Sequence, residues 1–201
     1  MSQPFPSHPN LEGGFAPIHM ECDAPDLVVE GEVPQELRGA FFRNGPNPQF
    51  APRGEYHWFG GDGMVHGFYI ADGKVNYKNR YVQSVKYKKE VEAGRSLFGA
   101  FNPMENDESV MGLETDGLAN TNIVYHAGKL LALEEAHAPF ELDPMTLESV
   151  GPHTFGDKLV GPMTAHPKMD PETGEMLFFG YNADGMISEH MSFHVVNKDG
   201  N

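Results

Sequence analysis

Cysteine is almost absent from this 201-residue chain, which contains only Cys22. A single cysteine excludes an intramolecular disulfide framework and a cluster of thiolates around a metal. Long apolar runs are missing too, since no stretch approaches the ~20 apolar residues that a membrane-spanning helix needs. The first residues also lack the basic start and apolar run of a secretory signal. We therefore expect a soluble, cytoplasmic protein.

Basic residues are scarce as well. The 14 lysines and arginines face 29 aspartates and glutamates, which gives a formal net charge of −15. This balance argues against a nucleic-acid partner, whose phosphates require Lys and Arg, and against charge-driven binding to anionic lipid. We expect a neutral or apolar small-molecule partner. The sequence does not indicate an oligomeric state.

Glycine and proline are frequent, with 23 and 16 copies, and the apolar runs between them are short. This pattern predicts many brief strands joined by tight turns and no substantial helix, hence an all-β fold. Residues 1–24 are expected to form an extended arm, and residues 27–34 a strand. Asp72-Gly73 and Ala127-Gly128 each separate two β-rich runs, which predicts two hairpins. Further strands are expected at 140–143, around 166 and at 192–196. Composition alone leaves a sandwich, a barrel and a propeller open.

Residues 90–104 interrupt this alternation and are expected to form a long loop. The loop carries an apolar cluster of Leu97, Phe98, Phe101 and Met104. Two roles are open for it: it covers the site, or it makes a peripheral membrane contact that collects a lipophilic substrate.

The last turn, Asp199-Gly200, has no returning strand. A sheet edge left without a partner is a feature that proteins usually avoid. We therefore expect this sequence to be the front part of a longer chain.

Four segments, in order along the chain, resemble one known family. They are residues 37–48 (LRGAFFRNGPNP), 56–66 (YHWFGGDGMVH), 131–136 with 143–148 (LALEEA and DPMTLE), and 164–175 (TAHPKMDPETGE). Together they resemble the N-terminal portion of the carotenoid cleavage oxygenases, the family of apocarotenoid oxygenases and lignostilbene dioxygenases.

The resemblance implies an incomplete part of a seven-bladed β-propeller, with residues 25–201 as its N-terminal blades. It also implies a non-haem Fe(II) on the propeller axis, held by four histidines from different blades. His166 corresponds to the first of these ligands, and the other three lie outside this chain. Neutral imidazoles leave the iron its positive charge and open positions for O2. The implied reaction cleaves a conjugated C=C bond of a carotenoid or apocarotenoid with O2 and gives two carbonyl products.

Glu135 stands where relatives place a glutamate behind an iron-binding imidazole. A carboxylate that accepts the distal N–H of a ligand fixes its tautomer and raises its basicity. The alternative is that Glu135 is a surface residue. His57, His66, His190 and His194 are left outside the predicted site.

The predicted substrate pocket contains Phe59, Phe98, Phe101 and Glu134. In the stilbene-cleaving members, the position of Glu134 favours a lysine that, with a tyrosine, binds a phenolate. Here a carboxylate would repel a phenolate, and neither Phe98 nor Phe101 can donate a hydrogen bond. An apolar polyene is therefore favoured, although the three phenylalanines are equally consistent with an ordinary core.

Three other functions stay open. The first is a stilbene-cleaving dioxygenase. The second is an inactive propeller that serves as a binding platform. The third is an isomerase-like or hydrolase-like member of the family that acts on a retinoid ester. Because one imidazole cannot hold Fe(II) against water, the 201 residues alone are expected to be inert.

Overall fold

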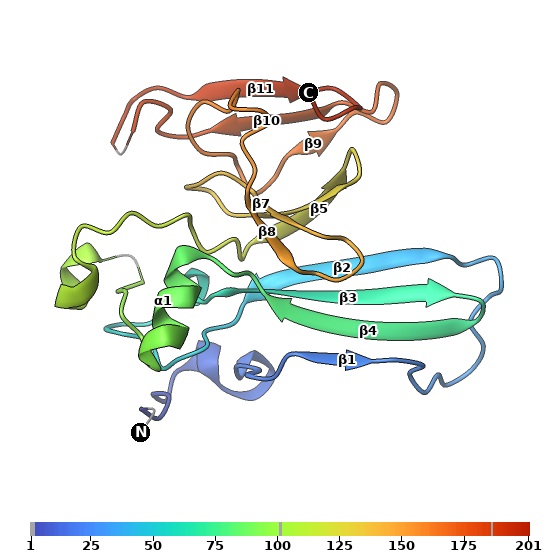
Figure 1. Ribbon diagram of the computed structural model, residues 1–201, viewed down its shortest axis with the longest axis horizontal. Helices are drawn as coiled ribbons and strands as arrows, with labels where there is room; N and C mark the ends of the chain where they lie inside the picture. The colour runs from blue at the N-terminus through green and yellow to red at the C-terminus, as the bar shows by residue number, and fades with distance from the viewer. Residues whose placement is uncertain (1–2, 101, 186) are drawn as a thin grey trace.

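The strands of this chain form three antiparallel sheets that lie one above another (Figure 1). The computed structural model describes residues 3–100, 102–185 and 187–201. The first sheet has the order β1-β4-β3-β2 and consists of β1 (Cys22–Ala24), β2 (Gly39–Pro46), β3 (Gly63–Ala71) and β4 (Lys74–Tyr81). The second sheet runs in chain order through β5 (Asn122–His126), β6 (Lys129–Leu133), β7 (Phe140–Leu142) and β8 (Ser149–Pro152). The third sheet has the order β11-β10-β9, with β9 (Lys168–Met169), β10 (Met176–Gly180) and β11 (Ser192–Val196).

The middle sheet lies between two hydrophobic cores, and its strand β6 contributes side chains to both. Leu130 and Ala132 belong to the core between the first and second sheets, while Leu131 and Leu133 belong to the core between the second and third. Successive strand residues point to opposite faces, so a strand covered on both sides reads as an unbroken apolar run. Sheets that follow one another along the chain and stack face to face are the arrangement of consecutive propeller blades.

Both predicted hairpins are confirmed. β3 and β4 pair across Asp72 and Gly73, which have φ of 52° and 75°, and β5 and β6 pair across Ala127 and Gly128, with φ of 49° and 81°. Positive φ at both central residues matches the right-handed twist of the paired strands. The strands predicted near 140–143 and at 192–196 are also present, as β7 and β11.

Two predictions about secondary structure are wrong. Residues 85–93 form a helix, α1 (Val85–Ala93), so the chain is mostly β but is not free of helix. The loop expected at 90–104 therefore begins only after residue 93. Ser84 caps its first turn by accepting a hydrogen bond from the Tyr87 N–H, and Gly94 ends it in the left-handed conformation with φ of 66°. The strand expected at 27–34 is absent. Short 3₁₀ turns complete the described elements: η1 (Pro9–Leu11), η2 (Gly13–Phe15), η3 (Trp58–Gly60), η4 (Pro103–Glu105) and η5 (Glu108–Val110).

The segment expected to be an arm contributes to the first sheet. Within residues 3–24, β1 pairs with β4 through Cys22, Asp23 and Ala24, which makes it the outer strand of that sheet. Asn79 of β4 reinforces this edge, because its side chain accepts a hydrogen bond from Cys22 N and donates one to the Met20 carbonyl. Among the described residues, no helix is long and apolar enough to cross a membrane.

Candidate metal centre

Strands β2, β5 and β9 each lie at an edge of their sheet, and two asparagine side chains connect these edges. Asn44 of β2 donates to the Ala119 and Asn122 carbonyls at 2.8 and 2.9 Å. Asn122 of β5 in turn donates to the Ala165 carbonyl at 2.7 Å. The segment just before β9 is thereby held against the same edge as β2 and β5. In a propeller, the blades surround a central channel.

His166 follows this anchored residue directly. Ala165 is fully buried in the core between the second and third sheets, whereas the His166 side chain is 64% exposed. The His166 N–H donates to the Thr164 Oγ1 at 3.2 Å, and Thr164 N donates to the Phe179 carbonyl of β10 at 2.8 Å. His166 therefore lies two residues before β9, outside the strand itself. Its backbone is fixed, and its exposed imidazole can reach a metal.

Glu135 lies beside His166, in the bend that follows β6. Its Oε1 is 3.6 Å from the His166 Nε2 and accepts a hydrogen bond from Thr164 Oγ1 at 3.3 Å. Its Oε2 is buried and has no hydrogen-bond partner among the described residues. A buried carboxylate oxygen without a donor is costly, so this atom is suited to receive an imidazole N–H.

Glu134 turns to different partners. Its Oε1 is bound by His137 Nδ1, and its Oε2 accepts from Leu118 N at 3.3 Å. The hydrogen bond that His137 donates to Glu134 outweighs the effect of burial, and with the negative charges of Glu134 and Asp116 it raises the pKa of His137. The carboxylate of Glu134 is thus largely satisfied by a histidine, a partner that the sequence reasoning did not identify.

The aromatic residues predicted to line a pocket fall in different environments. Phe59 lies in η3 and is half exposed, while Phe98 is buried with Leu97 and Val110 in a small core cluster. Phe101 lies outside the described residues. Met104, the fourth member of the predicted apolar cluster, is 82% exposed. Leu97 and Phe98 thus pack inside the described structure, whereas Met104 lies on its surface.

An Fe(II) site needs several ligands that converge on one point. In the described ranges 3–100, 102–185 and 187–201, no three His, Cys, Asp or Glu side chains converge as a metal site requires. One exposed imidazole beside a carboxylate with an unpartnered buried oxygen fits one ligand and its supporting acceptor. The residues fit part of an iron site, and the remaining ligands would come from elsewhere.

The four histidines left outside the site are engaged in other contacts. His66 Nδ1 lies 2.7 Å from the Tyr77 hydroxyl, and His194 Nε2 lies 3.3 Å from the Val160 carbonyl. His57 accepts from Phe59 N at the start of η3, and His190 pairs with Asp184.

A cavity of about 550 Å³ lies between the N-terminal segment, residues 49–53 and residues 94–96. Neither His166 nor the predicted pocket residues line this cavity.

The residues that sequence reasoning missed are those that position the site. Thr164, Asn122 and His137 hold His166, Ala165 and Glu134 in place. Polar side chains that bridge separate sheets leave no periodic signal. The roles of Thr164 and Asn122 become visible only from their hydrogen bonds to His166 and Ala165.

The stacked antiparallel sheets of this chain match one class of solved structures. A solved lignostilbene dioxygenase from Pseudomonas brassicacearum superposes with a TM-score of 0.93 at 38% identity, covering 100% of this chain and 42% of that one. A cobalt-substituted apocarotenoid oxygenase from Synechocystis superposes with a TM-score of 0.73 at 29% identity, covering 92% and 41%.

Sequence comparison gives the same class. The isoeugenol monooxygenase of Pseudomonas nitroreducens is 42% identical over 194 residues (96% of this chain, 40% of that protein), and lignostilbene-alpha,beta-dioxygenase isozyme III of Sphingomonas paucimobilis is 44% identical over 200 residues (98% and 41%). The carotenoid 9,10(9',10')-cleavage dioxygenase 1 of Phaseolus vulgaris is 40% identical over 211 residues (96% and 38%). The chain spans about 40% of the length of these relatives.

The profile of the family described as "Retinal pigment epithelial membrane protein" matches residues 15–201. The chain belongs to this family, that of the carotenoid cleavage oxygenases, and corresponds to the N-terminal portion of its members.

Proposed function

We propose that this chain is part of a non-haem Fe(II) dioxygenase that cleaves a conjugated C=C bond with O2 to give two carbonyl products. The observation that supports it most is the placement of His166 beside Glu135, next to the edge where the three stacked sheets are joined. In this proposal the polypeptide continues beyond residue 201, supplies three further histidines and closes a seven-bladed propeller around the metal.

The roles of the residues follow from their geometry. Iron, when bound, supplies the activation of O2. His166 offers an imidazole lone pair from a backbone that Thr164 and Asn122 hold in place. Glu135 would accept an imidazole N–H at its unpartnered oxygen, which fixes the tautomer and leaves the other ring nitrogen unprotonated for the metal. No side chain of this chain is needed as a general acid or base.

The proposed substrate is a carotenoid or apocarotenoid. A carboxylate at Glu134 repels a phenolate, and the half-exposed ring of Phe59 offers an apolar surface. An extended polyene needs apolar contact along its length and few polar partners.

A hydroxylated stilbene is the second candidate, and one observation favours it. The carboxylate of Glu134 accepts a hydrogen bond from His137, which engages one of its oxygens. The repulsion expected for a phenol oxygen is correspondingly weaker. The high TM-score to a lignostilbene dioxygenase supports the same candidate.

Cytoplasmic location and a peripheral membrane contact remain proposals. If a contact exists, the exposed Met104 is better placed to make it than the buried Leu97 and Phe98.

The test uses the complete protein, purified without O2 and loaded with Fe(II). It is incubated under O2 with an apocarotenal, a 4-hydroxylated stilbene and the unsubstituted stilbene, while loss of conjugated absorbance and the aldehydes formed are recorded. We expect His166→Ala to abolish cleavage, and Glu135→Gln to weaken iron binding by about 10- to 100-fold. His190→Ala is the matched control, because His190 is also an exposed histidine paired with a carboxylate.

Each outcome is informative. Apocarotenal cleavage that depends on His166 supports the proposal in full, and stilbene cleavage selects the second candidate. Stoichiometric iron without turnover of any substrate rejects alkene cleavage of these classes and favours an isomerase-like member. Failure of the complete protein to bind iron supports the inactive propeller.

A further inference from the structure

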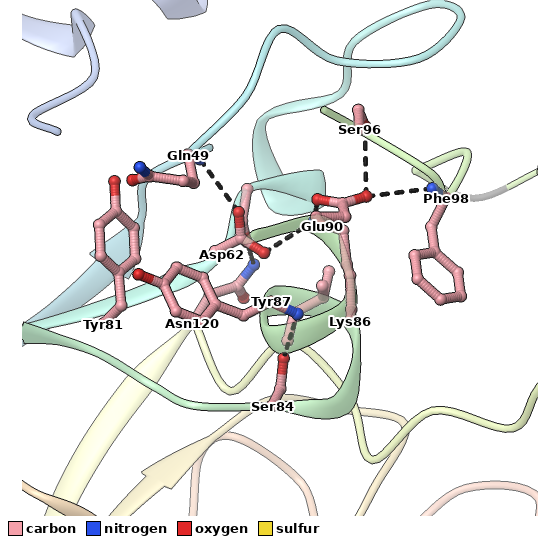
Figure 2. Close-up of polar contacts among 12 residues, drawn as sticks. Gln49, Asp62, Tyr81, Ser84, Lys86, Tyr87, Glu90, Ser96, Phe98 and Asn120 are labelled. Carbon is pink, nitrogen blue, oxygen red and sulfur yellow. Dashed lines mark hydrogen bonds and ion pairs between the residues drawn. The ribbon is translucent and has the colours of Figure 1, made fainter. Parts of the chain in front are cut away.

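A buried row of three charged side chains crosses the region between α1 and the start of β3 (Figure 2). Lys86 Nζ lies 2.7 Å from Asp62 Oδ1 and 2.8 Å from Glu90 Oε2. The side chains of Asp62 and Glu90 are each 2% exposed, and that of Lys86 is 9% exposed. Neither the metal centre nor the proposed chemistry uses these groups.

The Glu90 end of the row holds the segment that follows α1. Glu90 Oε1 accepts hydrogen bonds from Leu97 N at 2.8 Å, Phe98 N at 3.0 Å and Ser96 Oγ at 3.3 Å. Figure 2 shows the backbone nitrogen of Phe98 directed at this carboxylate and its ring directed away. One buried carboxylate oxygen therefore fixes three consecutive residues.

The Asp62 end holds the turn that carries Phe59. Asp62 Oδ2 accepts from Gln49 N at 3.0 Å, and Asp62 lies three residues after Phe59. The same turn is held from its other side by Asn120, whose Nδ2 donates to the Phe59 and Gly61 carbonyls at 2.7 and 2.6 Å. Lys86 thus joins two segments that are far apart in the sequence.

The two segments are also in direct contact. A Cβ added at Gly60 would lie 2.6 Å from the Ala100 Cβ, so residue 60 leaves no room for a side chain. Any shift of the 96–100 segment would change this contact. The position of the Phe59 turn and that of the 96–100 segment are therefore linked both by the row and by packing.

Charge is retained in this row despite burial. Burial alone lowers the pKa of Lys86, but the attraction of Asp62 and Glu90 together outweighs it and raises the pKa, so Lys86 is a cation at neutral pH. Buried ion pairs are often replaceable by apolar side chains without loss of stability. An acceptor oxygen is nevertheless needed here, since it accepts two backbone N–H groups that would otherwise be buried without a partner.

We propose that Lys86 and Glu90 are positioning residues of the substrate pocket, which set the 96–100 segment against the Phe59 turn. This inference rests on the proposed function, in which Phe59 contacts the substrate. Loss of the Glu90 carboxylate should release the segment and loosen substrate binding, while the metal and its ligands stay in place.

The test compares Glu90→Ala with Glu90→Gln in the complete protein. Glu90→Ala removes the acceptor, and Glu90→Gln keeps an acceptor oxygen for the Leu97 and Phe98 amides. Glu92→Ala is the matched control, because Glu92 lies on the same helix with a side chain that is 75% exposed. Hydrogen exchange of the Leu97 and Phe98 backbone amides is measured. KM and kcat are measured with whichever of the apocarotenal and the two stilbenes the protein cleaves.

We expect Glu90→Ala to speed exchange at these two amides by at least about tenfold, and to raise KM about tenfold with kcat changed by less than about twofold. Glu90→Gln should keep amide exchange and KM close to those of the unsubstituted protein. Glu92→Ala should match the unsubstituted protein in both quantities. If Glu90→Ala does not fold, Glu90→Asp carries the same expectation, because its shorter side chain withdraws the carboxylate from the amides.

Two results would overturn the inference. The first is faster exchange with an unchanged KM, which means that the segment is not part of the pocket. The second is a Glu90→Gln variant as impaired in KM as Glu90→Ala. If the unsubstituted protein cleaves no substrate, the proposed function fails and the pocket role fails with it. Exchange at Leu97 and Phe98 then still shows whether Glu90 holds the segment.

Discussion

At the scale of single residues, the two adjacent glutamates show how neighbouring side chains take different tasks. Glu135 turns to His166 and keeps one oxygen without a partner, whereas Glu134 is fully engaged by His137 and Leu118 N. Both lie just after the end of β6, so their directions are set by local contacts and not by strand alternation. The sequence identified the pair as important but could not identify the partner of each.

The Glu134–His137 pair predicts a pH-dependent contribution to stability. The folded pKa of His137 is raised, so its contribution is fully present below the unfolded value of about 6.5 and is lost as pH rises through the folded pKa. Glu134→Gln should therefore lower the free energy of unfolding by about 1 kcal/mol at acid pH, a figure reduced for partial exposure. The difference from the unsubstituted protein should shrink as the pH increases.

This prediction is checked by denaturant melts across the pH range, with Glu172→Gln as a control on an exposed glutamate. An unfolding difference that stays constant with pH would contradict an ionised pair and would indicate a contact between neutral groups.

At the scale of elements, the hairpins were predictable because their turns require particular residues. Asp72-Gly73 and Ala127-Gly128 both have positive φ, and the flanking runs pair as expected. Helix α1 was not predicted, because its buried residues include Lys86 and Glu90 in place of an apolar stripe. Its signals were Ser84 as cap, Gly94 at the end and a Lys–Glu pair four residues apart. The strand expected at 27–34 failed because β propensity cannot supply a neighbouring strand to pair with.

The close approach of β10 to the segment before His166 gives an element-scale prediction. A Cβ on Gly180 would lie 1.9 Å from the Pro162 carbonyl oxygen, and backbone atoms there cannot move without shifting residues 162–166. Gly180→Ala should destabilise the protein by about 2 kcal/mol and also weaken iron binding, because His166 moves with the segment. Thermal melting and iron titration of the complete protein measure the two effects.

Gly45→Ala is the matched control, since Gly45 also lies in a strand but a Cβ there meets no atom within 4 Å. Gly180→Ala with unchanged iron affinity would show that the segment before β9 adjusts independently of His166.

At the scale of the whole molecule, the stacked sheets were predictable as a class and the site only in part. Short apolar runs and tight turns indicated an all-β fold, which holds apart from α1, and the resemblance of four segments supplied the arrangement. The contacts that join the sheets were not predictable, because Asn44 and Asn122 act across distances of more than 40 residues in sequence. Whether ligands converge on a propeller axis depends on how several sheets are placed relative to one another. The sequence of a single strand does not predict that placement.

Iron binding should therefore belong to the complete molecule. His166 is one imidazole, and no three candidate ligands converge in the part of the chain that the structure describes. Since metal affinity requires several groups fixed together, residues 1–201 alone should lose Fe(II) to a weak chelator during desalting. The complete protein should keep about one iron per chain, and its His166→Ala variant should not. Anaerobic metal analysis after desalting distinguishes these. Stoichiometric iron on residues 1–201, lost on His166→Ala, would mean that Glu135 and neighbouring groups complete a site without further histidines, and the proposed four-histidine centre would have to be abandoned.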